Sequence, residues 1–428
     1  MAQKKAQRKQ QRKQQHKKDS MPQSRKQIPL KRVLMFHDGI FLKVNGSLER
    51  LLRDMMSHLL DNGFAVQAVS SKKAVEDVPV HFSSHPNFSL ATFDAQPRRQ
   101  TMPFDFPGMA PELNEILDAY DPDCILATVW AEYQFPIVNI PRKYPLFLIS
   151  PFGHYCSNGN VRSVMVSGAQ NTKFLNKRGI PQAKPLFNPI KAPTTYIKTP
   201  RKSGVVTFCR TGRGDDDIFD PISLRAFAKI EQKYGDRVLF RYVNASPRAL
   251  ALAKELGLKR VKFESWLTPA QLSDLYHDSD VFLHARYDGE TGGIAIAEAM
   301  LHGCSVVTHV SHHHNDHLVL IAEPSGRVAP SDDVDAYAAH IEWFITHHDD
   351  VAAHSKHARE KSKSLYDEQQ FWNLMMADFN MACSYKNKPL ESALRTSLWH
   401  AVQAVRARAV SLLPVSVKHK IIAVVSKK

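Results

Sequence analysis

The stretch from Val281 to Thr308, VFLHARYDGETGGIAIAEAMLHGCSVVT, contains two apolar strands separated by a glycine loop and a helix. Residues 281–284 and 305–308 are apolar runs of strand length. The segment that begins near Gly292 is predicted to be a helix. A strand, a helix and a second strand in this order form one βαβ unit, in which the two strands are parallel.

The loop of this unit is suited to a phosphate group. Thr291, Gly292 and Gly293 lie at the start of the predicted helix, where free N–H groups and the helix dipole favour an anion. The glycines allow close approach of the backbone. Glu290 precedes the helix and Glu298 lies more than one turn inside it. Since carboxylates accept from paired hydroxyls, the two could hold a ribose and a hexose on either side of a diphosphate.

The same alternation extends over most of the chain. An apolar run at 31–37 is followed by a Gly/Asn loop and a helical pattern at 48–60, and further strands are expected at 64–69, 124–129 and 145–149. After a proline-rich linker at 188–193, a second series has strands at 205–209, 238–242, 261–263, 281–284 and 305–308. Two such series predict an α/β fold with two facing Rossmann-like, doubly wound domains. Ligands should bind at the carboxyl ends of the strands, in the cleft between the domains.

The 428 residues exceed the size of a single hydrophobic core. We therefore expect two main domains, at 31–195 and 196–382, preceded by a disordered basic tail at 1–30. A basic amphipathic extension is expected at 383–428.

The positive charge of the protein lies in its two ends. Residues 1–32 contain twelve Lys and Arg against one Asp (+11), and residues 385–428 contain nine against one Glu (+8). Of the total of +15, this leaves −4 for residues 33–384. A basic groove for a nucleic-acid backbone is therefore not expected in the body.

The ends could bind another surface. An apolar stripe containing Leu398 and Trp399 is flanked by arginines, which suits an anionic membrane surface; docking on the protein's own body is the alternative. The five scattered cysteines form no CxxC pair, and neither a signal peptide nor a membrane span is visible. A cytoplasmic protein, peripheral on the inner face of a membrane, is expected.

The glutamate pair carries a resemblance to a known family. Glu290-x7-Glu298, followed by Ala299-Met300 and the strand entry at Gly303, resembles the signature of the group 1 glycosyl transferases (glycosyltransferase family 4, GT-B fold). The resemblance extends over residues 31–375 and implies that Glu290 faces the donor sugar and that Glu298 binds the ribose. It also implies that the intervening backbone meets the diphosphate. By the same resemblance, residues 31–195 form the acceptor-side domain and residues 196–382 form the nucleotide-sugar-binding domain.

Further residues agree with this resemblance. Asn45-Gly46-Ser47-Leu48-Glu49 resembles the family's Gly-Gly-x-Glu loop, which approaches the donor phosphate from the N-terminal domain. Arg210 and Arg213 lie where the family has its phosphate-binding Gly-Arg segment. The family's Lys, four or five residues later, is missing here: Asp215-Asp216-Asp217-Ile218 occupies that place. His154 follows a buried strand where the family often has a His near the donor sugar, and a structural role is the alternative.

Two clusters suggest metals and are interpreted otherwise. Five histidines between His309 and His317 could ligate zinc or nickel, but consecutive residues cannot all face one ion. The Asp215–Asp217 run is interpreted as a solvated loop, because the family works without a metal. No metal and no cofactor is expected, since the nucleotide sugar is a substrate.

The resemblance implies an enzyme of the hexosyltransferase type, which transfers a sugar with retention from a nucleotide-sugar donor to a glycan or lipid-linked acceptor. Polysaccharide or lipopolysaccharide biosynthesis would use such an activity. Two alternatives remain open: a non-catalytic binding protein with this fold, in which the missing Lys records lost activity, and a nucleotide-sugar epimerase.

Overall fold

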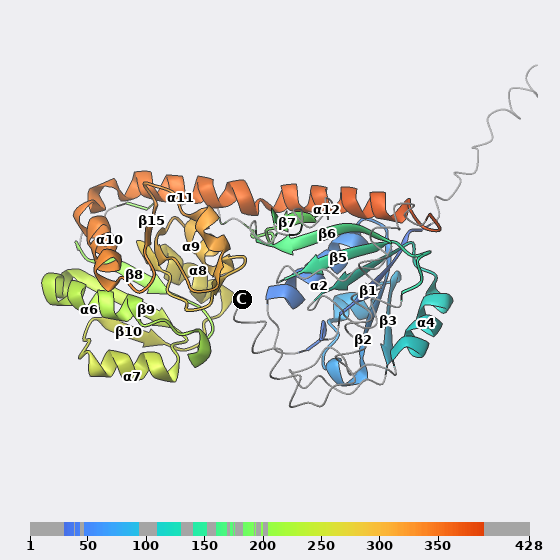
Figure 1. The fold of residues 1–428 in the computed structure, drawn as a ribbon, viewed down its shortest axis with the longest axis horizontal. Helices are drawn as coiled ribbons and strands as arrows, with labels where there is room; N and C mark the ends of the chain where they lie inside the picture. The colour runs from blue at the N-terminus through green and yellow to red at the C-terminus, as the bar shows by residue number, and fades with distance from the viewer. Residues whose placement is uncertain are drawn as a thin grey trace, which may run out of the picture.

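The computed structural model describes residues 30–37, 39–42, 47–93, 109–129, 140–151, 160–168, 172–173, 175, 183–191, 193, 198–199 and 204–388. These residues form two α/β domains joined by the linker around residue 190 and by a long helical segment near the end of the chain (Figure 1). The predicted fold class is confirmed.

The first domain is built on a parallel sheet of order β3-β2-β1-β4-β5-β6-β7. Its central strands are buried along their whole length, as expected for a sheet covered on both faces. The strands are β1 (Arg32–Phe36), β2 (Ala65–Ser71), β3 (Phe88–Phe93), β4 (Cys124–Thr128), β5 (Leu146–Ser150), β6 (Val161–Ser167) and β7 (Ala183–Leu186), with helices α2 (Ser47–Asp61), α3 (Val80–Ser83) and α4 (Met109–Tyr120).

The second domain repeats this topology in the order β10-β9-β8-β11-β13-β15, again with parallel pairing. Its strands are β8 (Val206–Arg210), β9 (Val238–Val243), β10 (Val261–Glu264), β11 (Val281–Leu283), β13 (Ser305–His309) and β15 (Gly326–Ala329). Its helices are α6 (Ile222–Tyr234), α7 (Pro247–Glu255), α8 (Pro269–His277), α9 (Ile294–Leu301), α10 (Val334–Thr346) and α11 (Val351–Tyr366).

The strand order of each sheet reverses beside its first strand, at β1/β4 and at β8/β11. This reversal opens a crevice at the carboxyl ends of the strands, where α/β proteins bind ligands. In Figure 1 the arrowheads of β5 and β6 point toward the second domain. The crevice of the first domain therefore opens toward its neighbour.

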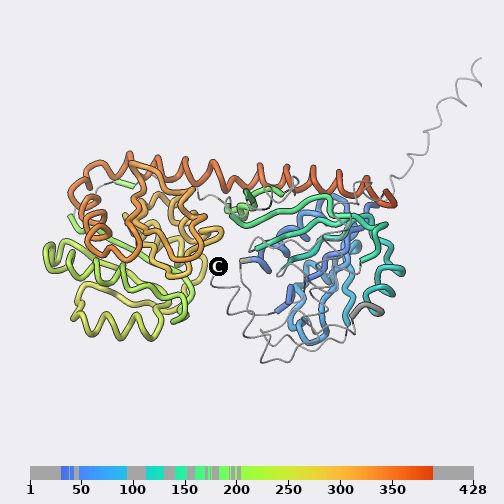
Figure 2. The backbone as a smooth tube through the Cα atoms, viewed as in Figure 1, coloured from blue at the N-terminus to red at the C-terminus, as the bar shows by residue number. Residues whose placement is uncertain are grey.

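The last described helix, α12 (Glu368–Cys383), returns to the first domain. Figure 2 shows α11 and α12 running along the two domains in succession. Phe371, Met375 and Phe379 of α12 belong to the hydrophobic core of the first domain, and the Phe379 ring stacks on Phe147 at 4.5 Å. Residues 368–382 were expected in the second domain but pack on the first, because periodicity reveals an apolar face but not the sheet that covers it.

The linker is attached to the second domain through a buried lysine. Lys198 is 2% exposed, and its Nζ donates to the carbonyls of Tyr276 at 2.6 Å and His277 at 3.2 Å. A cation at this point satisfies the free carbonyls at the C-terminus of α8. The carbonyl oxygens thus stabilise the buried positive charge of Lys198, and these hydrogen bonds hold the linker in place.

Candidate functional site

The loop before α9 has the backbone conformation that its glycines permit. Gly293, the N-cap of α9, has a left-handed conformation with φ of 62°. Gly289 has φ of 74°, and a Cβ there would lie 1.8 Å from the carbonyl oxygen of His314. A Cβ on Gly292 would meet nothing within 4 Å. Helix α9 begins at Ile294, two residues after the predicted start. The loop is therefore packed on one side and open at Gly292.

Glu290 lies in this loop, beside a cation. Its Oε1 is 3.2 Å from Nη1 of Arg286, and the Glu290 side chain is 24% exposed. Arg286 also holds Asp288 with two hydrogen bonds, of 2.6 and 2.9 Å. Burial raises the pKa of Glu290, although the Arg286 charge opposes this effect. The single positive charge of Arg286 is thus shared by two carboxylates, so it neutralises the negative charge of Glu290 only in part.

Two histidine rings, of His284 and His317, contact the hydroxyl of Thr308, and His309 lies close to them. Oγ1 of Thr308 is 2.8 Å from Nδ1 of His284 and 3.2 Å from Nε2 of His317. Nε2 of His284 is 3.9 Å from Oε1 of Glu290. Nε2 of His309 lies 3.5 Å from Oδ2 of Asp220. Burial lowers the pKa of all three rings, to about 4 for His317.

Glu298 faces a different set of groups from Glu290. Burial raises its pKa, and the charge of Arg50 on α2 of the first domain lowers it. The Glu298 charge in turn contributes, after burial, to the raised pKa of Tyr276. The Tyr276 hydroxyl is 2.9 Å from Oγ1 of Thr211, which follows β8. Glu298 therefore lies between a tyrosine–threonine pair and a cation of the other domain.

The two arginines after β8 have different environments. Arg213 is 61% exposed and pairs with Asp215 at 3.3 Å, and its charge lowers the pKa of Glu290. Arg210 is 8% exposed. Its Nη1 donates to Oγ of Ser223 at 3.3 Å, and its guanidinium lies 4.9 Å from the centre of the Tyr242 ring. The structure thus brings Arg213 to Glu290 and holds Arg210 inside the domain.

The aspartates that replace the family's lysine have local structural partners. Oδ1 of Asp216 accepts the backbone N–H of Arg248 at 2.9 Å, and this bond lowers the pKa of Asp216. The carbonyl of Ile218 accepts the N–H of Tyr287, in the loop that leads to Glu290, at 3.1 Å. Position 218 therefore contacts the loop before α9 through its backbone.

The first domain presents a similar triad at its own crevice. Nδ1 of His37, directly after β1, is 2.7 Å from Oγ1 of Thr128. Nε2 of His37 is 3.3 Å from Oε1 of Glu49 on α2. Glu49 is the last residue of the segment that resembles the family's phosphate loop. Three predicted site residues lie outside the described residues, namely Asn45, Gly46 and His154.

The domains approach each other closely beside the site. Gly168 follows β6, and a Cβ there would lie 2.3 Å from Cγ of Asp316, which precedes His317 in the second domain. A larger side chain at position 168 would displace the carboxyl group of Asp316. The end of β6 and the segment beneath Glu290 are therefore in contact.

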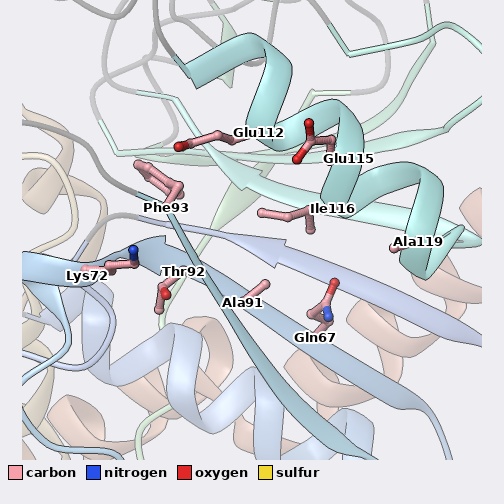
Figure 3. Close-up of a pocket in the computed structure, with 9 residues that line it drawn as sticks. All are labelled: Gln67, Lys72, Ala91, Thr92, Phe93, Glu112, Glu115, Ile116 and Ala119. Atoms are coloured by element: carbon pink, nitrogen blue, oxygen red, sulfur yellow. The ribbon is translucent and has the colours of Figure 1, made fainter.

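A separate cavity lies between the first sheet and α4. Its volume is about 450 Å³. Figure 3 shows Glu112 and Glu115 of α4 facing the end of β3, with the Lys72 ammonium group directed toward the space between them. The side-chain oxygen of Gln67 is buried and forms no hydrogen bond among the described residues. The lining consists of Gln67, Lys72, Ala91, Thr92, Phe93, Glu112, Glu115, Ile116 and Ala119.

Two features are absent from the part of the chain that the structure describes. No group of three or more His, Cys, Asp or Glu side chains there is arranged to hold a metal ion. None of the described helices is long and apolar enough to cross a membrane.

Three residues at this site, Arg286, His284 and Tyr366, are not among those predicted from the sequence. Arg286 had a visible signal, because it precedes Glu290 by four residues, with Asp288 between them. Tyr366 lies at the end of α11 and donates to the carbonyl of Gly292. Nothing in the local sequence of Tyr366 indicates this contact, since the two residues are 74 positions apart.

The paired Rossmann-like sheets and the acidic pair at the start of α9 define a protein of the GT-B type. Residues 222–361 match the family described as "Glycosyl transferases group 1". This segment contains both Glu290 and Glu298, so the resemblance seen in the sequence is confirmed there. Comparison with curated proteins gave no match.

Solved structures share the fold over most of the chain. Sucrose-phosphate synthase from Thermosynechococcus elongatus is 15% identical, with a TM-score of 0.60, covering 82% of this chain and 98% of its own. HepE from Anabaena, in complex with UDP and glucose, is 15% identical, with a TM-score of 0.57 and coverages of 82% and 100%. WaaG, a glycosyltransferase involved in lipopolysaccharide biosynthesis, is 16% identical, with a TM-score of 0.58 and coverages of 80% and 98%.

Proposed function

We propose that this protein is a retaining glycosyltransferase that transfers a sugar from a nucleotide-sugar donor to a glycan or lipid-linked acceptor. The observation that carries the proposal is the position of Glu290 and Glu298 on either side of the open start of α9. A diphosphate at Thr291, Gly292 and Gly293 would meet the free N–H groups of that helix. The ribose would then lie near Glu298 and the sugar near Glu290.

The difficult step in such a reaction is departure of the nucleotide diphosphate. The N-terminus of α9, together with Arg213, would stabilise the negative charge that grows on the leaving group. Glu290 would orient the sugar and favour the positive ring. Binding of the ribose by Glu298 supplies remote binding energy that holds the reacting carbon in position. Closure of the domains would exclude water and limit hydrolysis of the donor.

We assign Arg210 a supporting role, because its guanidinium contacts Ser223 and Tyr242. From its buried position it adds positive potential beneath the site. His154, Asn45 and Gly46 remain candidates on the side of the first domain by family resemblance. A cofactor or metal is not part of the proposed mechanism, since the donor already carries the activated bond.

The acceptor is proposed to bind in the cavity between β3 and α4 (Figure 3). Lys72 follows β2 and Phe93 ends β3, so both lie at the carboxyl edge of the first sheet, whose crevice opens toward the second domain. Two carboxylates, an amide and an aromatic wall are suited to a sugar ring with several hydroxyls. Glu115→Gln should therefore raise KM for the acceptor and leave donor affinity unchanged. Glu255→Gln, on the surface of α7, is the control.

A panel of labelled nucleotide sugars tests the proposed reaction. Slow hydrolysis of one donor without acceptor supports a transferase, an altered sugar supports an epimerase, and binding without turnover supports a non-catalytic module.

Glu298→Gln should weaken binding of the free nucleoside diphosphate about tenfold or more, because a charged hydrogen bond contributes about 1.5–3 kcal/mol. Glu290→Ala should spare that affinity and lower kcat and kcat/KM together. Unchanged nucleotide affinity in a folded Glu298→Gln protein would reject the assignment of the ribose site.

The location proposed for this activity is the cytoplasmic face of a membrane, where a lipid-linked acceptor would be met. Its support is the net charge of +11 on residues 1–32 and of +8 on residues 385–428, compared with −4 between them. Both basic ends lie almost wholly outside the described residues.

A further inference from the structure

The group that faces Glu290 from below is His284, and its surroundings determine where its proton lies. Oγ1 of Thr308 has two imidazole nitrogens within 3.2 Å and also donates to the carbonyl of His309 at 3.5 Å. A hydroxyl has one proton and two lone pairs. Since the carbonyl can only accept, all three contacts are satisfied when both imidazoles donate. His284 then carries its proton on Nδ1.

In a neutral ring of this tautomer, Nε2 of His284 bears a lone pair. This atom is buried and has no hydrogen-bond partner, and it lies 3.9 Å from Oε1 of Glu290. A lone pair that faces a carboxylate oxygen is repelled by it, whereas a proton between the two atoms converts the contact into an attraction. Shortening the distance by about 1 Å, through rotation of the carboxyl group, would form a hydrogen bond.

The charges around His284 oppose a second proton on its ring. Burial lowers its pKa first, and the neighbouring His317, His309, Arg210 and Arg286 act in the same direction. By contrast, burial raises the pKa of Glu290. Both shifts therefore favour the carboxyl group over the imidazole as the holder of the proton.

We propose that His284 is a positioning residue that accepts a hydrogen bond from protonated Glu290 before a donor binds and so sets the pH above which Glu290 is charged. The role assigned to Glu290 rests on the proposed function. The proton leaves Glu290 for solvent as the pH rises, and its oxygen retains lone pairs that accept from Arg286. The other groups that face this pair are Asp288, Arg213, His309, His317, Arg210 and the hydroxyl of Tyr366.

The variant His284→Asn separates this role from a purely structural one. Its amide N–H replaces Nδ1–H as the donor to Thr308, while the acceptor at Nε2 is removed. The protonated form of Glu290 then loses its partner, so its pKa falls. We expect the acidic limb of the kcat/KM profile to move down by about one pH unit. At a pH below the acidic limb of both proteins, the ratio of kcat/KM to its plateau value would then be about tenfold higher in His284→Asn than in the unmodified protein.

His309→Asn is the matched control. Its ring is 6.5 Å from that of His284 and faces Asp220 instead of Glu290, so the limb should stay where it is. An upward shift in His284→Asn would show that His284 is a cation that stabilises the carboxylate, and an unmoved limb would show that the two residues do not interact. Either result overturns the proposal.

A measurement independent of turnover is available in the unmodified full-length protein. NMR of protein labelled in its histidine nitrogens should show His284 neutral, with the proton on Nδ1, between pH 5.5 and 8. The carboxyl resonance of Glu290, identified by its loss in Glu290→Gln, should titrate above the ordinary value of 4.5. A doubly protonated His284 in this range overturns the proposal. Lack of turnover with every donor would reject the proposed function while leaving this titration decisive.

Discussion

The hydroxyl of Tyr366 donates a hydrogen bond to the carbonyl of Gly292. Tyr366 is the last residue of α11, and α12 begins two residues later on the first domain. Its side chain is 2% exposed and contacts Phe187, which follows β7 of the first domain. Gly292, in the loop before α9, is therefore tied to the point at which the chain crosses between domains. A change in the angle between the domains would act directly on the loop.

Tyr366→Phe should remove this bond without creating a cavity. We expect unfolding free energy to fall by about 1 kcal/mol and affinity for a nucleoside diphosphate to fall severalfold, because the Gly292 carbonyl is no longer held. Tyr144→Phe is the control, since its hydroxyl donates to the carbonyl of Leu117, in the first domain, at 3.1 Å. Chemical denaturation and calorimetry would measure the two effects. Equal affinity losses in both variants would contradict the proposed coupling.

Gly292→Ala tests whether a ligand approaches the backbone of the loop. The new Cβ would meet nothing within 4 Å in the protein itself, so stability should change by less than about 1 kcal/mol. A diphosphate placed on the start of α9 would meet this methyl group, and its affinity should fall at least about tenfold. In Gly212→Ala the new Cβ would also meet nothing within 4 Å. This control variant should bind the diphosphate with an affinity closer to that of the unmodified protein. Tight nucleotide binding by Gly292→Ala would place the diphosphate elsewhere.

The two arginines after β8 should respond differently to replacement. Arg213 is exposed near Glu290, so Arg213→Ala should lower donor affinity about tenfold and reduce its dependence on salt. Arg210 is packed against Ser223 and Tyr242, so Arg210→Ala should mainly lower unfolding free energy, by about 1–3 kcal/mol. Calorimetry at two salt concentrations and denaturation would separate these outcomes. Donor affinity insensitive to both replacements would indicate a vestigial pocket.

Nucleotide affinity should depend on pH through Glu298. Only the ionised carboxylate accepts from both ribose hydroxyls, and burial raises its pKa above the ordinary 4.5. Nucleotide affinity should therefore reach its maximum above the raised pKa of Glu298 and decline as the pH falls through that pKa. For unfolding the sign is opposite: the native state binds this proton more tightly, so the contribution of Glu298 to stability falls as pH rises above 4.5. Calorimetry between pH 5 and 8 should show a slope that Glu298→Gln abolishes.

The basic ends should bind anionic vesicles. Each Lys or Arg near an anionic leaflet contributes about 1 kcal/mol, and salt screens this attraction. The apolar stripe around Trp399 should add a part that salt does not remove. Full-length protein should float with anionic liposomes, and deletion of residues 389–428 should release it. Deletion of residues 1–29 should cause a smaller, salt-sensitive loss. Protein that stays in the soluble fraction at low salt would contradict membrane binding.

Local sequence was sufficient for most strands of both sheets. The runs at 124–129, 238–242 and 305–308 correspond to β4, β9 and β13, because continuous apolar segments bounded by polar turns are typical of buried parallel strands. Strands β3, β6, β7 and β15 were not predicted. The partly exposed β3, FSLATF, lacks both an unbroken apolar run and a strict alternation.

The sequence by itself determined the two βα series and the acidic pair around the glycine loop, since these depend on residues close together in the chain. Only the tertiary structure decided which distant groups surround that pair. His284, Thr308 and His317 converge because β11, β13 and the segment after β13 are neighbours at one sheet edge. Tyr366 reaches Gly292 because α11 packs against α9. The charge state of Glu290 depends on burial and on these neighbours, which no local pattern records.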